Sequence, residues 1–180
     1  LPARLTPVHI SAKADYAMRA LLVIARSGHY RPIKGATIAD EQDMPPKYVE
    51  NILVDLRRAG LVASQRGSEG GFRLARPANE ITVAYVVRAT DGPLAEVRGL
   101  RPEEVDYEGA AEHLLSIWLA VRVSLRSVLE NVTLEQVATG KLPRNIAKLA
   151  ENPEAMLTRQ TRPGVNPSKS ATRPPPRLRS

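Results

Sequence analysis

The chain has 180 residues, a formal net charge of +7 and no cysteine, which excludes disulfides, thiolate metal sites and cysteine nucleophiles. The basic charge is uneven, with 13 Lys and Arg against 8 Asp and Glu in residues 1–90, 7 against 9 in residues 91–150, and 6 against 2 in residues 151–180. This distribution is typical of a protein with a nucleic-acid partner. No apolar run approaches the roughly 18–20 residues of a membrane span and no signal peptide is visible, so we expect a cytoplasmic protein without a membrane partner.

Residues 1–8 are predicted to be an N-terminal extension, and residues 9–26 a helix. The helix has apolar residues at three- and four-residue steps, and Ser11 can cap its first turn. Lys13, Tyr16 and Arg19 on its other side either reach a DNA phosphate or are simply solvated, and the sequence leaves both alternatives open.

A helix-turn-helix is predicted next. A short helix over residues 37–42 has Thr37 as its N-cap and Asp40 in the third position of a capping box. A proline pair then turns the chain sharply, and a longer helix runs over residues 46–59, with Pro46 suited to its first position. Short helix, tight turn and longer helix is the order of this motif.

The longer helix has one apolar stripe and one polar face, and a Gly-rich β-hairpin with several arginines follows it. A helix able to enter a major groove beside such a hairpin is the layout of a winged helix on DNA. The alternative is an ordinary surface helix, because Glu50 and Asp55 would repel phosphate. The predicted DNA-binding residues are Lys47, Tyr48, Glu50, Asn51, Arg58, Arg66 and Arg73.

A helix over residues 82–89 completes a DNA-binding domain of residues 9–92, and a charged loop spans residues 93–106. The longest helix follows, over residues 107–131, with apolar residues alternately three and four positions apart, as in a seam between two helices. We favour a homodimer, because groove-reading modules usually work in symmetric pairs; the alternative is packing on the chain's own domain. The predicted seam consists of Ala111, Leu114, Trp118, Val121, Leu125, Val128 and Val132.

The end of the chain is predicted to consist of a last short helix and a disordered tail. Thr133 opens a capping box for a last short helix, which completes a dimerisation region of residues 107–142. Residues 143–180 are predicted to be a disordered basic tail, because they are rich in proline and poor in large apolar residues.

The chain resembles the Rrf-two family of bacterial winged-helix regulators, which includes the iron–sulfur cluster regulator and the cysteine-metabolism repressor. The resemblance is carried by Ile10-Ser-Ala-Lys-Ala-Asp-Tyr-Ala, by Pro46-Lys-Tyr-Val-Glu-Asn-Ile-Leu, by Arg66-Gly-Ser-Glu-Gly-Gly-Phe-Arg-Leu-Ala and by Val132-Thr-Leu-Glu-Gln-Val. It implies that Tyr48 is the family's helix tyrosine, that Glu50 and Asn51 face base edges, and that Arg66 enters the minor groove. Glutamate can accept from cytosine, asparagine pairs with adenine, and arginine suits a narrow minor groove.

The expected sensor region departs from the family's pattern. Cluster-binding relatives have three cysteines before the dimer helix, and this chain has none. We therefore expect no iron–sulfur cluster, no other metal and no cofactor, and control by a small metabolite or a partner enzyme, unless the loop is vestigial and DNA binding constitutive. The effector candidates are Arg98, Arg101, Glu108, Glu112, His113 and Trp118.

These observations predict a mainly α fold with a small β wing, consisting of a winged helix-turn-helix domain and a long dimerisation helix. The predicted function is that of a homodimeric transcription regulator, most simply a repressor, on palindromic double-stranded DNA. The alternative is an interaction module that binds a biosynthetic enzyme such as a cysteine synthase. An enzyme is not predicted, because the sequence has no nucleophile–base pattern, phosphate-binding loop or metal-ligand spacing.

Overall fold

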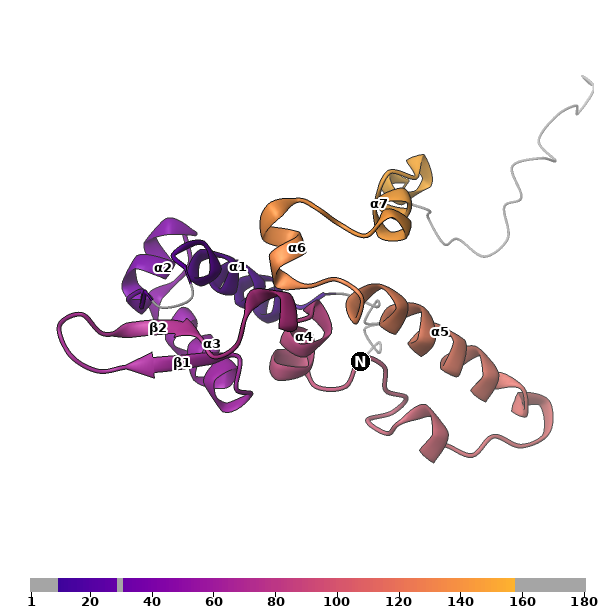
Figure 1. The fold of residues 1–180 in the computed structure, drawn as a ribbon. Coiled ribbons are helices and arrows are strands. Elements are labelled where there is room, and N and C mark those ends of the chain that lie inside the picture. The colour runs from indigo at the N-terminus through magenta and orange to yellow at the C-terminus, as the bar shows by residue number, and fades with distance from the viewer. Residues whose placement is uncertain (1–9, 29–30, 158–180) are drawn as a thin grey trace, which may run out of the picture.

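The computed structural model describes residues 10–28 and 31–157 of the chain (Figure 1). The fold is mainly α with one two-stranded antiparallel sheet, as predicted. The elements are α1 (Ala12–Arg26), α2 (Gly35–Glu41), α3 (Pro46–Arg58), β1 (Val62–Gln65), β2 (Gly71–Leu74), α4 (Val83–Asp91), α5 (Leu114–Leu129), α6 (Leu134–Thr139) and α7 (Arg144–Ala150). Among the helices of the described ranges, none is long and apolar enough to cross a membrane.

Helix α1 lies at the centre of the core. The Ser11 hydroxyl accepts a hydrogen bond from the Ala14 N–H at 2.9 Å, so the predicted N-cap is confirmed. Apolar residues on its inner face, such as Leu21 and Ile24, are fully buried, and the helix packs against α3, α4 and α6. Figure 1 shows these helices grouped around α1, with the β1–β2 wing projecting at one end and α5 extending at the other.

The helix-turn-helix consists of α2 and α3, but the predicted start of α2 was wrong. The helix begins at Gly35 with Lys34 as its N-cap, so Thr37 lies within it and no capping box forms there. The reason is tertiary: the backbone of Ile33 exchanges hydrogen bonds of 2.9 and 2.7 Å with Phe72 of the wing. This pairing keeps the chain extended up to Lys34, and the helix begins at the next residue, Gly35.

The wing is an antiparallel hairpin in which Val62 pairs with Leu74 and Gln65 with Gly71. Two glycines of the wing lie so close to other backbone atoms that a side chain would not fit there. A Cβ on Gly71 would lie 2.4 Å from the Ile33 carbonyl oxygen, and one on Gly70 would lie 2.4 Å from that of Gln65. A side chain at Gly71 would therefore push the wing away from Ile33, and one at Gly70 would distort the turn of the hairpin itself.

Helix α5 is shorter than predicted, and two ends of the predicted seam were wrong. Gly109, at φ 58°, begins a separate 3₁₀ turn that contains Ala111, and α5 starts only at Leu114. Val132 lies beyond α5 and is buried, because its carbonyl accepts from the Val83 N–H at 2.9 Å where the chain returns to α4. The other five predicted seam residues lie on α5, where Val121, Leu125 and Val128 line an apolar groove and Leu114 and Trp118 do not.

Helix α6 begins as predicted, with the Thr133–Gln136 capping box. The prediction of a disordered tail from residue 143 was wrong for its first part. Pro143 precedes a helix, α7, that buries Ile146, and a 3₁₀ turn follows at Pro153–Met156. Proline suits the boundary because it needs no N–H partner there, and residues 144–150 contain no further proline or glycine. Residues 1–8 and 158–180 lie outside the described residues.

Candidate nucleic-acid interface

Helix α3 presents one face to the core and the other to solvent. Val49, Ile52, Leu53 and Leu56 are each at most 1% exposed, so the apolar stripe anchors the helix. The opposite face carries the exposed Lys47, Tyr48, Glu50 and Asn51, all of them predicted DNA-binding residues. The helix is thereby held rigidly with its polar side chains directed outward, as a base-reading helix must be.

The acidic residues of α3 are paired with basic ones. The Lys47 ammonium lies 3.0 Å from the Glu50 carboxylate, and both side chains are well exposed. Asp55 lies 2.7 Å from the Lys13 ammonium and 3.5 Å from the Arg58 guanidinium. Two cations therefore offset the charge of Asp55, which weakens the objection that this helix would repel phosphate.

Two tyrosines connect α3 to the start of α1. The rings of Tyr16 and Tyr48 meet edge to face with their centroids 5.5 Å apart. The Arg19 guanidinium lies 5.4 Å from the centre of the Tyr16 ring and donates to the Gln42 side chain at 3.1 Å. Arg19 thus contacts the turn between α2 and α3, while the Tyr16 ring packs against Tyr48 on the exposed face of α3.

The wing places its arginines differently. Arg66 is exposed where β1 ends and the turn begins, which is the position from which a wing side chain can extend. Arg73 is half-buried on β2 and donates to the Leu74 carbonyl at 3.3 Å. Arg76, beyond β2, lies over the Tyr85 ring at 5.4 Å. Of these three, Arg66 is the side chain best placed to reach a groove.

The effector candidates do not form one cluster. Glu112 and His113 lie 3.2 Å apart on the exposed surface before α5, and Arg98 is exposed in a tight turn at φ 57°. Glu108 is exposed as well, whereas the Trp118 indole nitrogen is buried without a hydrogen-bond partner among the described residues. A cavity of about 420 Å³ between α4 and α5 is lined by Arg101 and by none of the other candidates.

Three further arginines line that cavity and were missed by the sequence analysis: Arg88 of α4, and Arg122 and Arg126 of α5. Arg122 lies 2.5 Å from the Glu103 carboxylate. A backbone hydrogen bond and this guanidinium hold the pKa of the Glu103 carboxyl below its usual value, so it is charged at neutral pH. The available signal was the four-residue spacing of Arg122 and Arg126, which puts both on one side of a helix.

Comparison with known proteins identifies the family. Residues 10–140 match the Rrf2 family, described as iron-dependent transcriptional regulators, and this match covers more than half of the chain. The chain belongs to the Rrf2 family. It is 44% identical over 145 residues to the Mycobacterium tuberculosis protein Rv1287, covering 81% of this chain and 90% of that protein. It is also 30% identical over 130 residues to the HTH-type transcriptional regulator CymR of Bacillus subtilis, covering 72% of this chain and 89% of CymR.

Solved Rrf2 structures have the same fold. The structure of CymR, the global cysteine regulator of B. subtilis, matches with a TM-score of 0.62 at 29% identity, covering 73% of this chain and 97% of that one. T. potens IscR matches with a TM-score of 0.57 at 28% identity, covering 84% and 93%. The predicted winged-helix fold is confirmed. This Rrf2 chain is a DNA-binding transcriptional regulator and not an enzyme, and the alternative of an interaction module gains no support.

The family is described as iron-dependent, which raises the question of whether this chain has residues that could bind iron. The chain has no cysteine to ligate a cluster. Within residues 10–28 and 31–157, no three His, Asp or Glu side chains come close enough together to hold a metal ion. The donor set of this Rrf2 protein therefore does not fit a cysteine-ligated iron–sulfur cluster.

Proposed function

We propose that this Rrf2 protein is a homodimeric, sequence-specific repressor that binds a palindromic operator in the cytoplasm. The observation that carries the DNA-reading part is the exposed polar face of α3, fixed on four buried apolar residues beside the Arg66 wing. In the bound state Asn51 and Glu50 contact base edges in the major groove, and Arg66 enters the minor groove. Glu50 must then exchange its pairing with Lys47 for a base, which leaves that ammonium free for a phosphate.

The dimer part is supported by α5, none of whose residues is buried. An apolar groove of about 460 Å³ runs along it, lined by Ile117, Ala120, Val121, Ser124, Leu125, Val128 and Leu129. Ile117 is 56% exposed, which is unusual for a large apolar residue in a helix of this kind. We propose a second copy of this chain as the occupant, because a two-fold pair of α5 helices would cover both grooves and set two α3 helices on successive half-sites.

Control is proposed to act without an iron–sulfur cluster, through a small metabolite or a partner protein. The site would be the segment of residues 93–106 and its junction with α5, because this segment joins each DNA-binding unit to the proposed dimer helix. A change in their relative angle alters the spacing of two α3 helices, which must meet half-sites roughly 34–36 Å apart. An effector shifts this equilibrium only if it binds the two arrangements unequally.

The test is a fluorescence anisotropy titration of the protein against its own promoter region and against a shuffled duplex of equal length. Specific regulation predicts at least roughly 1,000-fold tighter binding to the promoter at physiological salt. Sedimentation of the free protein at micromolar concentration should give the dimer mass. Equal affinity for the two duplexes would refute sequence-specific binding, and a monomeric mass would refute the dimer.

A further inference from the structure

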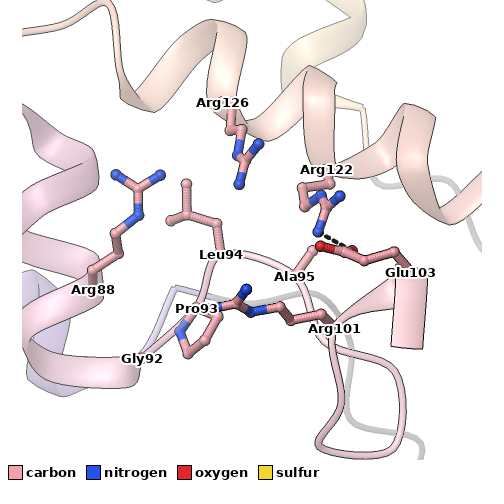
Figure 2. Close-up of a pocket in the computed structure, with 9 residues that line it drawn as sticks. All are labelled: Arg88, Gly92, Pro93, Leu94, Ala95, Arg101, Glu103, Arg122 and Arg126. Carbon is pink, nitrogen blue, oxygen red and sulfur yellow. Dashed lines mark hydrogen bonds and ion pairs between the residues drawn. The ribbon is translucent and has the colours of Figure 1, made fainter. Parts of the chain in front are cut away.

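The cavity between α4 and α5 has an unusual chemical lining. Four arginines and one glutamate surround it, together with a short stretch of small and apolar residues: Arg88, Arg101, Arg122, Arg126, Glu103, Gly92, Pro93, Leu94 and Ala95. Figure 2 shows Arg88 entering from α4, and Arg122 and Arg126 from α5, with Leu94 between the two helices. Arg101 enters from the segment that connects them.

The positive charge of this cavity exceeds the negative charge beside it. Glu103 pairs with Arg122 at 2.5 Å. Glu130 at the end of α5 pairs closely with Arg88 and only loosely, at 3.8 Å, with Arg126. Arg101 forms no direct ion pair among the described residues, although its charge helps to hold the pKa of the Glu103 carboxyl below its usual value. Only two carboxylates thus neutralise the four guanidinium groups. Arg101 and Arg126 keep N–H donors that can bind an anion.

The four guanidinium groups differ in exposure. The Arg122 side chain is only 15% exposed, so solvent screens its charge less, whereas Arg126 is 46% exposed and Arg101 is exposed as well. Guanidinium groups donate in pairs to carboxylate and phosphate oxygens, and such charge-assisted bonds are among the strongest hydrogen bonds in proteins. The volume of about 420 Å³ lies within the range of small-molecule sites.

We propose that this cavity binds a small, multiply charged anion, either a phosphate ester or a di- or tricarboxylate, and that this anion is the effector of the regulator. The effector role rests on the function proposed above. Arg101 and Arg126 supply the free donors, and Arg88 and Arg122 complete the positive wall. Leu94 adds apolar surface to the lining, which favours a ligand carrying a short carbon skeleton over a bare ion.

The four arginines are carried by different elements of the fold, and this explains how a bound anion would act. Arg88 belongs to α4, which packs on α1 and α3 of the DNA-binding unit, whereas Arg122 and Arg126 belong to α5. Without an anion, the Arg88–Glu130 pair links the two helices, while the guanidinium groups around the cavity still repel one another. A bound anion links the two sides and draws α4 toward α5. The angle between the DNA-binding unit and α5 then depends on occupancy of the cavity.

The test is calorimetric titration of the full-length protein with inorganic phosphate and, separately, with citrate, at constant ionic strength in chloride. At least one probe should bind one site per chain with a Kd below about 1 mM. Tighter binding of phosphate indicates a phosphate ester, and tighter binding of citrate indicates a polycarboxylate. Binding of neither probe overturns the proposal.

Three variants and a control sharpen this test. Arg101→Gln and Arg126→Gln should each weaken the better probe roughly 10- to 100-fold, the worth of one or two charge-assisted hydrogen bonds. Glu103→Gln should strengthen binding, because it frees Arg122 and removes a like charge. Arg144→Gln removes an exposed charge on α7, outside the cavity, and should change nothing. Circular dichroism verifies the fold of each variant, and the opposite sign expected for Glu103→Gln cannot result from misfolding.

Anion and promoter binding measured on the same samples distinguish a failure of the anion proposal from a failure of the proposed regulatory function. If the probes bind as expected but the promoter does not, the cavity is an anion site and the regulatory function is wrong. If the promoter binds and the probes do not, the anion proposal alone is wrong. If Arg101→Gln and Arg126→Gln weaken promoter binding while anion binding is undetectable, the arginines contact DNA phosphates, and the effector proposal is overturned.

Discussion

Helix α3 and helix α5 use their apolar residues in opposite ways. Leu53 and three neighbours on α3 are buried against α1, α2 and α4, whereas α5 buries none of its residues. Both helices have apolar residues at similar spacings, so the sequence pattern alone does not distinguish them. The same kind of apolar pattern can therefore be covered within one chain, as in α3, or by a second chain, as we propose for α5.

The largest expected effect tests the completeness of the α3 core. Leu53→Ala should lower the free energy of unfolding by about 2–5 kcal/mol, because it removes a fully buried side chain and leaves a cavity. Ile117→Ala on α5, measured under conditions where the protein is monomeric, should change it by less than about 0.5 kcal/mol. Urea denaturation followed by circular dichroism measures both. Equal losses would mean that α5 is part of the same folded core.

The next effect concerns the exposed face of α5. Val121→Glu places a charge in the apolar groove and should convert the dimer into monomers, with a loss of operator affinity on the order of 100-fold because two linked contacts become one. Val123→Glu is the matched control, since Val123 is 62% exposed and does not line the groove. Sedimentation velocity and operator titration should separate the two variants. A dimeric Val121→Glu protein would place the interface elsewhere.

A smaller effect is expected at the exposed face of α3. Asn51→Ala should remove roughly 1–3 kcal/mol of discrimination at one base pair of each half-site, as for a lost bidentate contact. Binding to operators mutated at single positions would locate that base pair. The fold should be unaffected because Asn51 is exposed. A uniform loss across all operators would indicate that Asn51 contacts the backbone and not a base.

The smallest predicted effect is that of the wing. Arg66→Ala should reduce the slope of log affinity against log salt concentration by about 1, and should lower the preference for A·T-rich flanks with a narrow minor groove. Arg73→Ala is the comparison variant, because its guanidinium already donates to the Leu74 carbonyl. Anisotropy titrations at several salt concentrations measure both slopes. A larger change for Arg73→Ala would reverse the assignment of the wing contact.

Much of the DNA-reading surface was predictable from residues close together in the chain. Pro46 at the first turn of α3, the apolar steps from Val49 to Leu56 and the glycines of the wing are local signals, and the structure places each of them as expected. The Ser11 and Thr133 caps are equally local, because a cap and its helix are adjacent in sequence. The DNA contacts of this surface stay predictions.

The cavity arginines were not predictable in the same way. Arg88, Arg101 and Arg122 are separated by more than ten residues each and share no motif. Their meeting depends on how α4, the connecting segment and α5 fold back on one another. The predicted effector set missed three of the four arginines for this reason, and included exposed residues such as Glu112 and His113 that lie outside the cavity.

The sequence by itself determined the type and order of the helices from α1 to α6 and the wing, because hydrophobic period, caps and turn residues act within a few positions of the chain. It also excluded a cysteine-ligated cluster through composition alone. Only the tertiary structure decided where α2 begins, since that depends on the pairing of Ile33 with Phe72. It also decided that α5 remains uncovered and that four arginines meet in one cavity, because both depend on contacts between segments that no local pattern connects.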